Sequence, residues 1–179
     1  MKSIRDVVGE DLFWAQTHAL KHEYELRAGD GVVATLRWQK RFGSLALGEA
    51  AEGAWTFKRG GFLRPHVTIR EANSGIEVAR FEAGWLGGGT IELHGVTLRF
   101  GTSNFWGSEQ AWTNASDEHL IYFKDRSSLL KSRARVTIEP SAASTPELSL
   151  LVLLGWYVTI LTAEGEAIVA GGAAAGGAG

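Results

Sequence analysis

The sequence lacks cysteine, a large excess of either charge, and a hydrophobic run long enough to cross a membrane. Without cysteine, the chain has no disulfides, no thiolate catalysis and no cysteine-based metal site. A formal net charge of -2 argues against non-specific nucleic-acid binding as the main function. The longest apolar run, 148–162, has about 15 residues, whereas a transmembrane helix needs roughly 20. The sequence therefore predicts no transmembrane span.

Several catalytic and targeting motifs are also missing. No G-x-S-x-G element is present, and Gly87-Gly88-Gly89 precedes a predicted strand rather than the helix of a P-loop. The N-terminal stretch MKSIRDVVGEDLFW carries charges where a signal peptide needs an apolar segment. We therefore expect a cytoplasmic protein without a cofactor, and enzymatic activity is disfavoured.

The apolar run itself, LSLLVLLGWYVTILT, predicts a helix buried on every side. Its apolar side chains occupy all faces, whereas a surface helix would show a single stripe. Thr145 is a candidate N-cap and Gly165 a candidate C-terminal stop, which places the helix at 146–164. Gly155 in its middle predicts a close approach by a strand or a bulky side chain, and Trp156 and Tyr157 need buried hydrogen-bond partners.

The residues before this helix are predicted to form short strands. Hairpins are predicted around Asp30-Gly31, around 73–75 and around Ser116-Asp117, with shorter strands at 44–49, 54–58, 90–93, 96–100 and 134–139. The fold class is therefore mainly β, a closed antiparallel β-barrel of about twelve strands around the buried C-terminal helix. An ordinary β-sandwich with the helix across one mouth is the alternative. In domain terms, 1–22 is an N-terminal extension, 23–165 the barrel with its helix, and 166–179 a flexible Gly/Ala-rich tail.

The closing segment PELSLLVLLGWYVTILT, the two early hairpins and the stretch SNFWGSEQAW (103–112) carry a family resemblance. Together they resemble the tubby C-terminal-like superfamily, which includes tubby domains, phospholipid scramblases and LURP-one-related proteins, and more closely its uncharacterised bacterial members. The resemblance covers roughly 23–164 and implies a closed barrel around a central helix. In tubby domains a basic patch binds phosphoinositide headgroups, but its positions have no residue-by-residue match here. The scramblase calcium segment and cysteine-rich stretch have no counterpart either.

Basic residues form three groups in the sequence. The first is Arg37, Lys40 and Arg41, the second is Lys58, Arg59 and Arg64, and the densest is Lys124, Arg126, Lys131, Arg133 and Arg135. Strand alternation places Lys131, Arg133 and Arg135 on one outward face. Such a row is either a solvated outer surface or a binding site for phosphate groups, which arginine holds in bidentate fashion.

The histidines and tryptophans also allow two interpretations each. His18 and His22 have a spacing that suits metal binding on a helix, but no H-E-x-x-H motif is present, so an exposed N-terminal element is favoured. No metal site is predicted. The seven tryptophans fill the space between barrel wall and helix, or those near 81–89 and 105–107 form an exposed platform for lipid or sugar.

Three functional hypotheses remain from the sequence. The first is a non-enzymatic binding module that recognises anionic phospholipid headgroups, peripherally at the membrane, or a protein partner. Its candidate ligand-binding residues are Lys124, Arg126, Lys131, Arg133 and Arg135. The second is a scramblase-like protein whose helix leaves the barrel and inserts in the bilayer. The third is a hydrolase with an unrecognised site.

Overall fold

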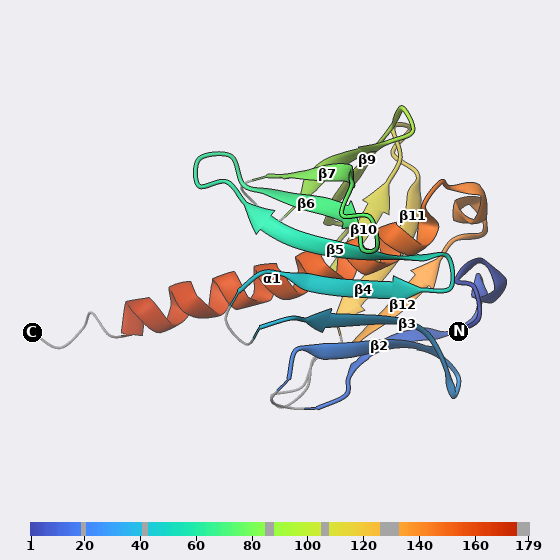
Figure 1. The fold of residues 1–179 in the computed structure, drawn as a ribbon, viewed down its shortest axis with the longest axis horizontal. Coiled ribbons are helices and arrows are strands. Elements are labelled where there is room, and N and C mark those ends of the chain that lie inside the picture. Colours follow the sequence, from blue (N-terminus) through green and yellow to red (C-terminus); the bar gives the residue numbers. More distant parts are fainter. Residues whose placement is uncertain (19–20, 41–42, 85–87, 105–107, 126–132, 175–179) are drawn as a thin grey trace, which may run out of the picture.

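The computed structural model describes residues 1–18, 21–40, 43–84, 88–104, 108–125 and 133–174. Twelve strands pair with their sequence neighbours in antiparallel fashion, and β1 pairs with β12 to close the barrel (Figure 1). One long helix, α1, runs through its interior. The predicted barrel around a C-terminal helix is confirmed, and the β-sandwich alternative is wrong.

The strands are short and evenly spaced. Their bounds are β1 Leu12–Gln16, β2 Glu23–Ala28, β3 Gly31–Trp38, β4 Ala46–Ala50, β5 Gly53–Gly60, β6 His66–Glu71, β7 Glu77–Ala83, β8 Gly89–Leu93, β9 Val96–Thr102, β10 Glu109–Thr113, β11 His119–Asp125 and β12 Arg133–Ile138. Two short 3-10 helices, η1 (Arg5–Val7) and η2 (Pro140–Ser144), precede β1 and α1 (Leu148–Ala174). Successive strands need only tight connections because each pairs with the next.

Alternation of side chains builds the barrel wall. Along β12, Ala134, Val136 and Ile138 are buried while Arg133 and Thr137 are exposed, which is the period of two expected for a strand with one face on a core. The predicted hairpins are present, although the first turns at Gly29 and Asp30, one residue earlier than predicted. Gly29 has a φ of 54°, which explains its place in the turn.

The first three turns of α1 are enclosed by the barrel. Every residue from Leu148 to Val158 is buried. At Gly155 the helix and the wall approach closely, since a Cβ there would lie 2.5 Å from Cζ of Phe123 and 2.9 Å from Nε1 of Trp112. Trp112 donates a hydrogen bond from Nε1 to the Leu151 carbonyl at 2.8 Å. Burial on every side is therefore confirmed for 148–158, while 159 and 161–164 are partly exposed, and the close approach predicted at Gly155 is confirmed.

The ends of the predicted helix are wrong. Thr145 is extended and ends η2, and α1 begins only at Leu148, after Glu147 has adopted a φ of 53°. The helix also continues through Gly165 to Ala174, because Gly165 does not adopt the positive φ of a helix stop. On the N-terminal side of the chain, the barrel starts at β1 rather than at residue 23, since Leu12 and Trp14 of β1 are fully buried.

The length of α1 corrects the membrane argument as well. The window Leu148–Gly165 is long and apolar enough to span a bilayer, so run length alone does not exclude a span. However, 67% of this window is buried inside the protein. A helix enclosed by its own barrel shows the same composition as a membrane helix, because both lack contact with water.

Candidate functional site

The up-and-down topology gives the barrel two distinct ends. Odd-numbered strands end at the side of the barrel where α1 leaves it, and even-numbered strands end at the side where α1 begins. We call these the exit end and the start end. In Figure 1 the C-terminal part of α1 projects from the exit end, while η2 and the N-terminus lie at the start end.

The exit-end connections are basic in sequence. They span 17–22, 39–45, 61–65, 84–88, 103–108 and 126–132. These segments contain no Asp or Glu. Their six basic residues are Lys21, Lys40, Arg41, Arg64, Arg126 and Lys131. Of these, Lys21, Lys40 and Arg64 are described and exposed. Arg41, Arg126 and Lys131 lie outside the described residues.

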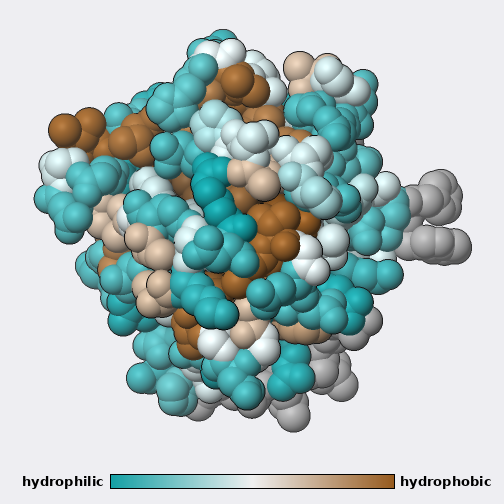
Figure 2. Space-filling model, turned by 90° about the vertical axis from the view of Figure 1, so that its right-hand side faces the viewer, coloured by the Kyte–Doolittle hydropathy of each residue, from teal (hydrophilic) through white to brown (hydrophobic). Residues whose placement is uncertain are grey.

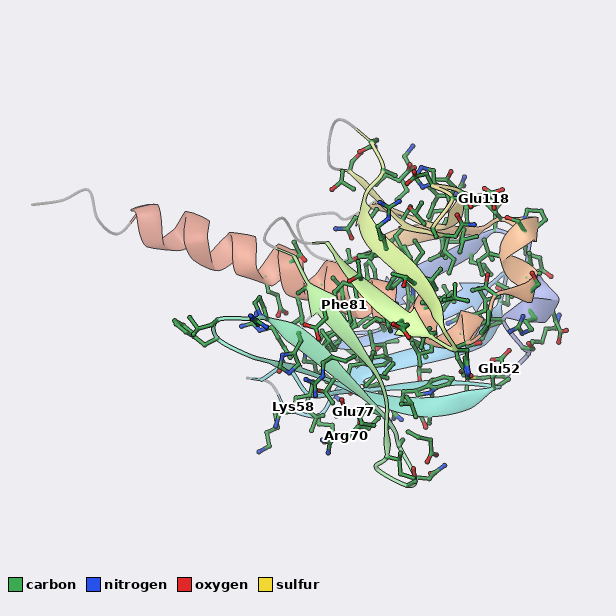
Figure 3. The ribbon with its side chains drawn as sticks, turned by 90° about the horizontal axis from the view of Figure 1, so that it is seen from above. Glu52, Lys58, Arg70, Glu77, Phe81 and Glu118 are labelled. Carbon is green, nitrogen blue, oxygen red and sulfur yellow. The ribbon has the colours of Figure 1, made fainter. Side chains whose placement is uncertain are left out.

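The start-end connections show the reverse pattern. They span 29–30, 51–52, 72–76, 94–95, 114–118 and 139–147. These segments contain no Lys or Arg. Their acidic residues are Asp30, Glu52, Asp117, Glu118, Glu139 and Glu147. Figure 3 shows Glu52 and Glu118 at this end and Lys58 toward the other. Acidic groups near the N-terminus of α1 complement the helix dipole.

Glu52 shows this complementarity in detail. Its carboxylate accepts hydrogen bonds from Ser3 Oγ, from the Ile4 N–H at 3.1 Å and from Ser149 Oγ, in the first turn of α1, at 2.7 Å. Burial raises the pKa of Glu52, but the hydrogen bonds that its carboxylate accepts, among them those from Ser3 and Ser149, outweigh it, so the pKa lies below the ordinary value of a glutamate. The acidic end therefore also has a structural role in holding the start of α1.

At the exit end, the β5–β6 connection exposes two large apolar side chains. Phe62 is fully exposed and Leu63 is 82% exposed. Basic residues flank them, with Lys58 and Arg59 on one side and Arg64 on the other. The sequence analysis found the basic group but missed Phe62 and Leu63. The signal that could have revealed them is a pair of bulky apolar residues inside a Gly- and Pro-bounded turn.

A pocket of about 240 Å³ lies beside this connection. It is lined by residues of β5, β6, β7 and α1, among them Arg59, His66, Phe81, Val158 and Leu161. Tyr157 fixes its rim, since its hydroxyl donates to the Ser44 carbonyl and accepts the Arg59 N–H at 3.2 Å. Burial raises the pKa of Tyr157 to about 12, so the hydroxyl stays protonated and able to donate at neutral pH.

The predicted row on β12 is only partly assembled by the structure. Arg133 is exposed at the exit-end start of β12, and Lys124 on β11 is exposed opposite Arg135 in the ladder. Arg135 is half-buried, with its guanidinium 5.3 Å from the centre of the Phe13 ring and its Nε 3.8 Å from Asp11. Of the predicted outward row, Arg133 is exposed, whereas Arg135 packs against its own barrel. Lys131 and Arg126 lie outside the described residues.

A second pocket, of about 450 Å³, opens at the start end. Trp55, Glu71, Val78, Leu93 and Leu150 line it. At its rim His94 and Glu147 lie 3.5 Å apart, each with a positive φ near 50°. Figure 2 looks onto this end and shows a central hydrophobic area framed by hydrophilic residues.

The remaining histidines are dispersed over the barrel. His22 Nδ1 lies 3.0 Å from Glu164 Oε1 on α1, His66 bonds to the Arg64 carbonyl and His119 lies near Thr113. The described part of the chain holds no group of three His, Cys, Asp or Glu residues able to bind a metal.

Among the tryptophans, Trp14, Trp55, Trp112 and Trp156 are buried, which confirms the core interpretation for them. Trp85, Trp106 and the platform segment 105–107 lie outside the described residues.

No protein-family model, no curated protein sequence and no solved structure matches this chain. The class of protein is therefore defined by its fold alone, a twelve-strand antiparallel barrel around a buried helix.

Proposed function

We propose that the protein is a non-enzymatic binding module that docks on anionic phospholipid surfaces through the exit end of its barrel. The observation that carries this proposal is the separation of charge, with Lys and Arg in the exit-end connections and Asp and Glu in those of the start end. Each Lys or Arg close to an anionic leaflet contributes about 1 kcal/mol to binding. Arg133, at the exit-end start of β12, and Lys124, near the exit-end terminus of β11, are exposed and are included in the proposed surface. Arg126 and Lys131 belong to the same basic group in the sequence but lie outside the described residues.

We also propose membership of the tubby C-terminal-like superfamily. The support is architectural, since a closed twelve-strand barrel around a buried C-terminal helix is what the resemblance implies. Headgroup binding by a basic surface agrees with this relationship, although the residues involved have no match in the tubby patch.

The scramblase-like alternative requires α1 to leave the barrel. Leu151, Leu153 and Leu154 are fully buried, and each such side chain contributes about 1.5–3 kcal/mol to the folded state. Extraction would also leave an empty barrel, so docking of the intact fold is favoured. The hydrolase alternative gains no support, since no serine hydroxyl in the described ranges is hydrogen-bonded to a histidine.

Co-sedimentation with vesicles tests the proposal. Wild-type protein should bind vesicles of phosphatidylcholine with phosphatidylserine and ignore phosphatidylcholine alone. The variant K21Q/K40Q/R64Q should bind about a hundredfold more weakly at physiological ionic strength, because three charges contribute about 3 kcal/mol. Its melting temperature should stay close to that of the wild type, since exposed substitutions change stability by less than about 0.5 kcal/mol each.

Two further variants locate the surface. K131Q/R133Q/R135Q should also weaken vesicle binding if the β11–β12 side takes part. The matched control D30N/E118Q/E139Q neutralises three acidic residues of the start end and should bind as wild type at physiological ionic strength. Wild-type protein that ignores anionic vesicles even at low salt would refute the lipid proposal and leave protein recognition as the function to test.

A further inference from the structure

We infer that the β5–β6 connection inserts Phe62 and Leu63 into the boundary between headgroups and acyl chains when the exit end docks. This inference rests on the proposed function and adds the element that enters the bilayer. Figure 1 shows the connection projecting at the end from which α1 emerges, so both face the same side of the molecule.

The exposure of these two side chains is the first argument. Soluble proteins seldom place adjacent large apolar side chains at a fully exposed tip without a binding partner. Phe62 is 100% and Leu63 82% exposed, the two highest values among the described large hydrophobic residues. Transfer of both side chains out of water would strengthen membrane binding in proportion to their apolar area.

The basic residues around Phe62 and Leu63 favour an anionic membrane as the binding partner of the β5–β6 connection. From Lys58 to His66 the chain contains Lys58, Arg59 and Arg64 and no acidic residue, while Glu82 lies opposite His66 on the neighbouring strand β7. In the described part of the chain, Lys58, Arg59 and Arg64 form no ion pair with a carboxylate, so their charges are available to phosphate groups. Apolar residues at a tip with basic residues behind them match the layering of an anionic leaflet, in which phosphates lie above the acyl chains.

The backbone holds the tip outward. Gly60 pairs with His66 at the base of the connection, and the Ala83 N–H donates to the Pro65 carbonyl at 3.0 Å. Gly61 has a φ of 76°, and a Cβ at this position would overlap the Arg64 carbonyl. The connection is therefore a constrained turn, and its apolar tip cannot fold back without breaking these contacts.

The other exposed apolar side chains have a different setting. Ile76, 65% exposed, lies in the β6–β7 connection at the start end, next to Glu77. Glu77 pairs with Arg70 and Arg80, and the connection 72–76 itself contains no Lys or Arg. Ile76 is thus a control, since it is a large exposed apolar residue at the opposite end of the barrel, in a connection without basic residues.

Site-specific labelling tests the inference, because the chain contains no cysteine and a single introduced thiol is unique. L63C and I76C are each labelled with an environment-sensitive fluorophore and mixed with phosphatidylcholine–phosphatidylserine vesicles. We expect a blue shift, and quenching by lipids brominated on the acyl chain, for the label at 63 and no change for the label at 76. A bound protein with an unchanged label at 63 would overturn the inference and leave the proposed function standing.

A second variant measures the contribution to affinity. F62S/L63S should bind these vesicles at least about tenfold more weakly with an unchanged melting temperature, since both side chains are exposed in the free protein. I76S should bind as wild type. Equal binding of F62S/L63S and wild type would contradict insertion, whereas no vesicle binding by the wild type would refute both insertion and the proposed function.

Discussion

Gly155 is a residue of α1 at which the helix and the barrel wall leave no room for a side chain. Substitution by alanine should lower the free energy of unfolding by about 1–2 kcal/mol. The new methyl group would press on Phe123 and Trp112, and overpacking of about 1–3 kcal/mol exceeds the gain in helix propensity. Chemical denaturation measures the change.

Gly165 provides the control for this substitution. It lies in the same helix with no atom within 4 Å of its missing Cβ, so Gly165→Ala should be neutral or stabilising by up to about 1 kcal/mol. If both alanine variants gain stability, α1 does not pack against Phe123 as described.

Glu52 makes a prediction about pH. Because its pKa is lower in the folded protein than in the unfolded chain, its ionised form adds stability above the unfolded value of about 4.3, and this is lost as the pH falls through the folded pKa. The stability difference between wild type and Glu52→Gln should therefore be constant near neutrality and shrink in acid. Urea titrations at several pH values measure it, and a difference that grows on acidification would show the opposite sign of the shift.

At the scale of elements, the barrel depends on α1 as its core. Leu153→Asp should abolish soluble expression, because an unpaired buried carboxylate costs several kcal/mol against a domain stability of about 5–15 kcal/mol. Ile76→Asp introduces the same charge at an exposed site and should express normally. Normal melting of Leu153→Asp would show that α1 is not central.

Pattern and composition were sufficient to predict the barrel and its helix. Short alternating strands and an apolar run without a polar face leave few other ways to bury hydrophobic surface. The ends of α1 were not predictable in this way, because Thr145 and Gly165 have suitable chemistry for caps but tertiary packing decides where the helix begins and ends. Strand β1 was missed because five residues between charged segments give a weak signal, although Leu12 and Trp14 close the barrel.

The candidate site was predicted less well than the fold. The sequence indicates which residues are basic, but only the order of strands shows that the connections after odd-numbered strands meet at one end. Charge clustering along the chain therefore pointed to the row on β12, in which Arg135 packs on Phe13. The topology instead gathers Lys21, Lys40 and Arg64 from three distant connections.

For the whole molecule, orientation rather than net charge must determine binding, because the net charge of -2 is itself repelled by an anionic surface. A seven-residue strand such as β9 spans about 20 Å, which sets the distance between the two ends. The screening length is about 8 Å at physiological ionic strength and about 30 Å at 0.01 M. The acidic start end should therefore sense the membrane only at low salt.

The control variant D30N/E118Q/E139Q tests whether the start end lies beyond the screening length from the membrane. It should bind phosphatidylserine-containing vesicles as wild type does at physiological ionic strength and more tightly than wild type at about 0.01 M salt, because only there does repulsion of the start end reach the surface. K21Q/K40Q/R64Q should be weaker than wild type at both ionic strengths, since its residues lie at the docked end. Vesicle co-sedimentation at the two salt concentrations measures both variants. If the acidic-end variant bound more tightly by the same factor at both, the start end would also lie within a screening length of the leaflet, and the barrel would dock on its side.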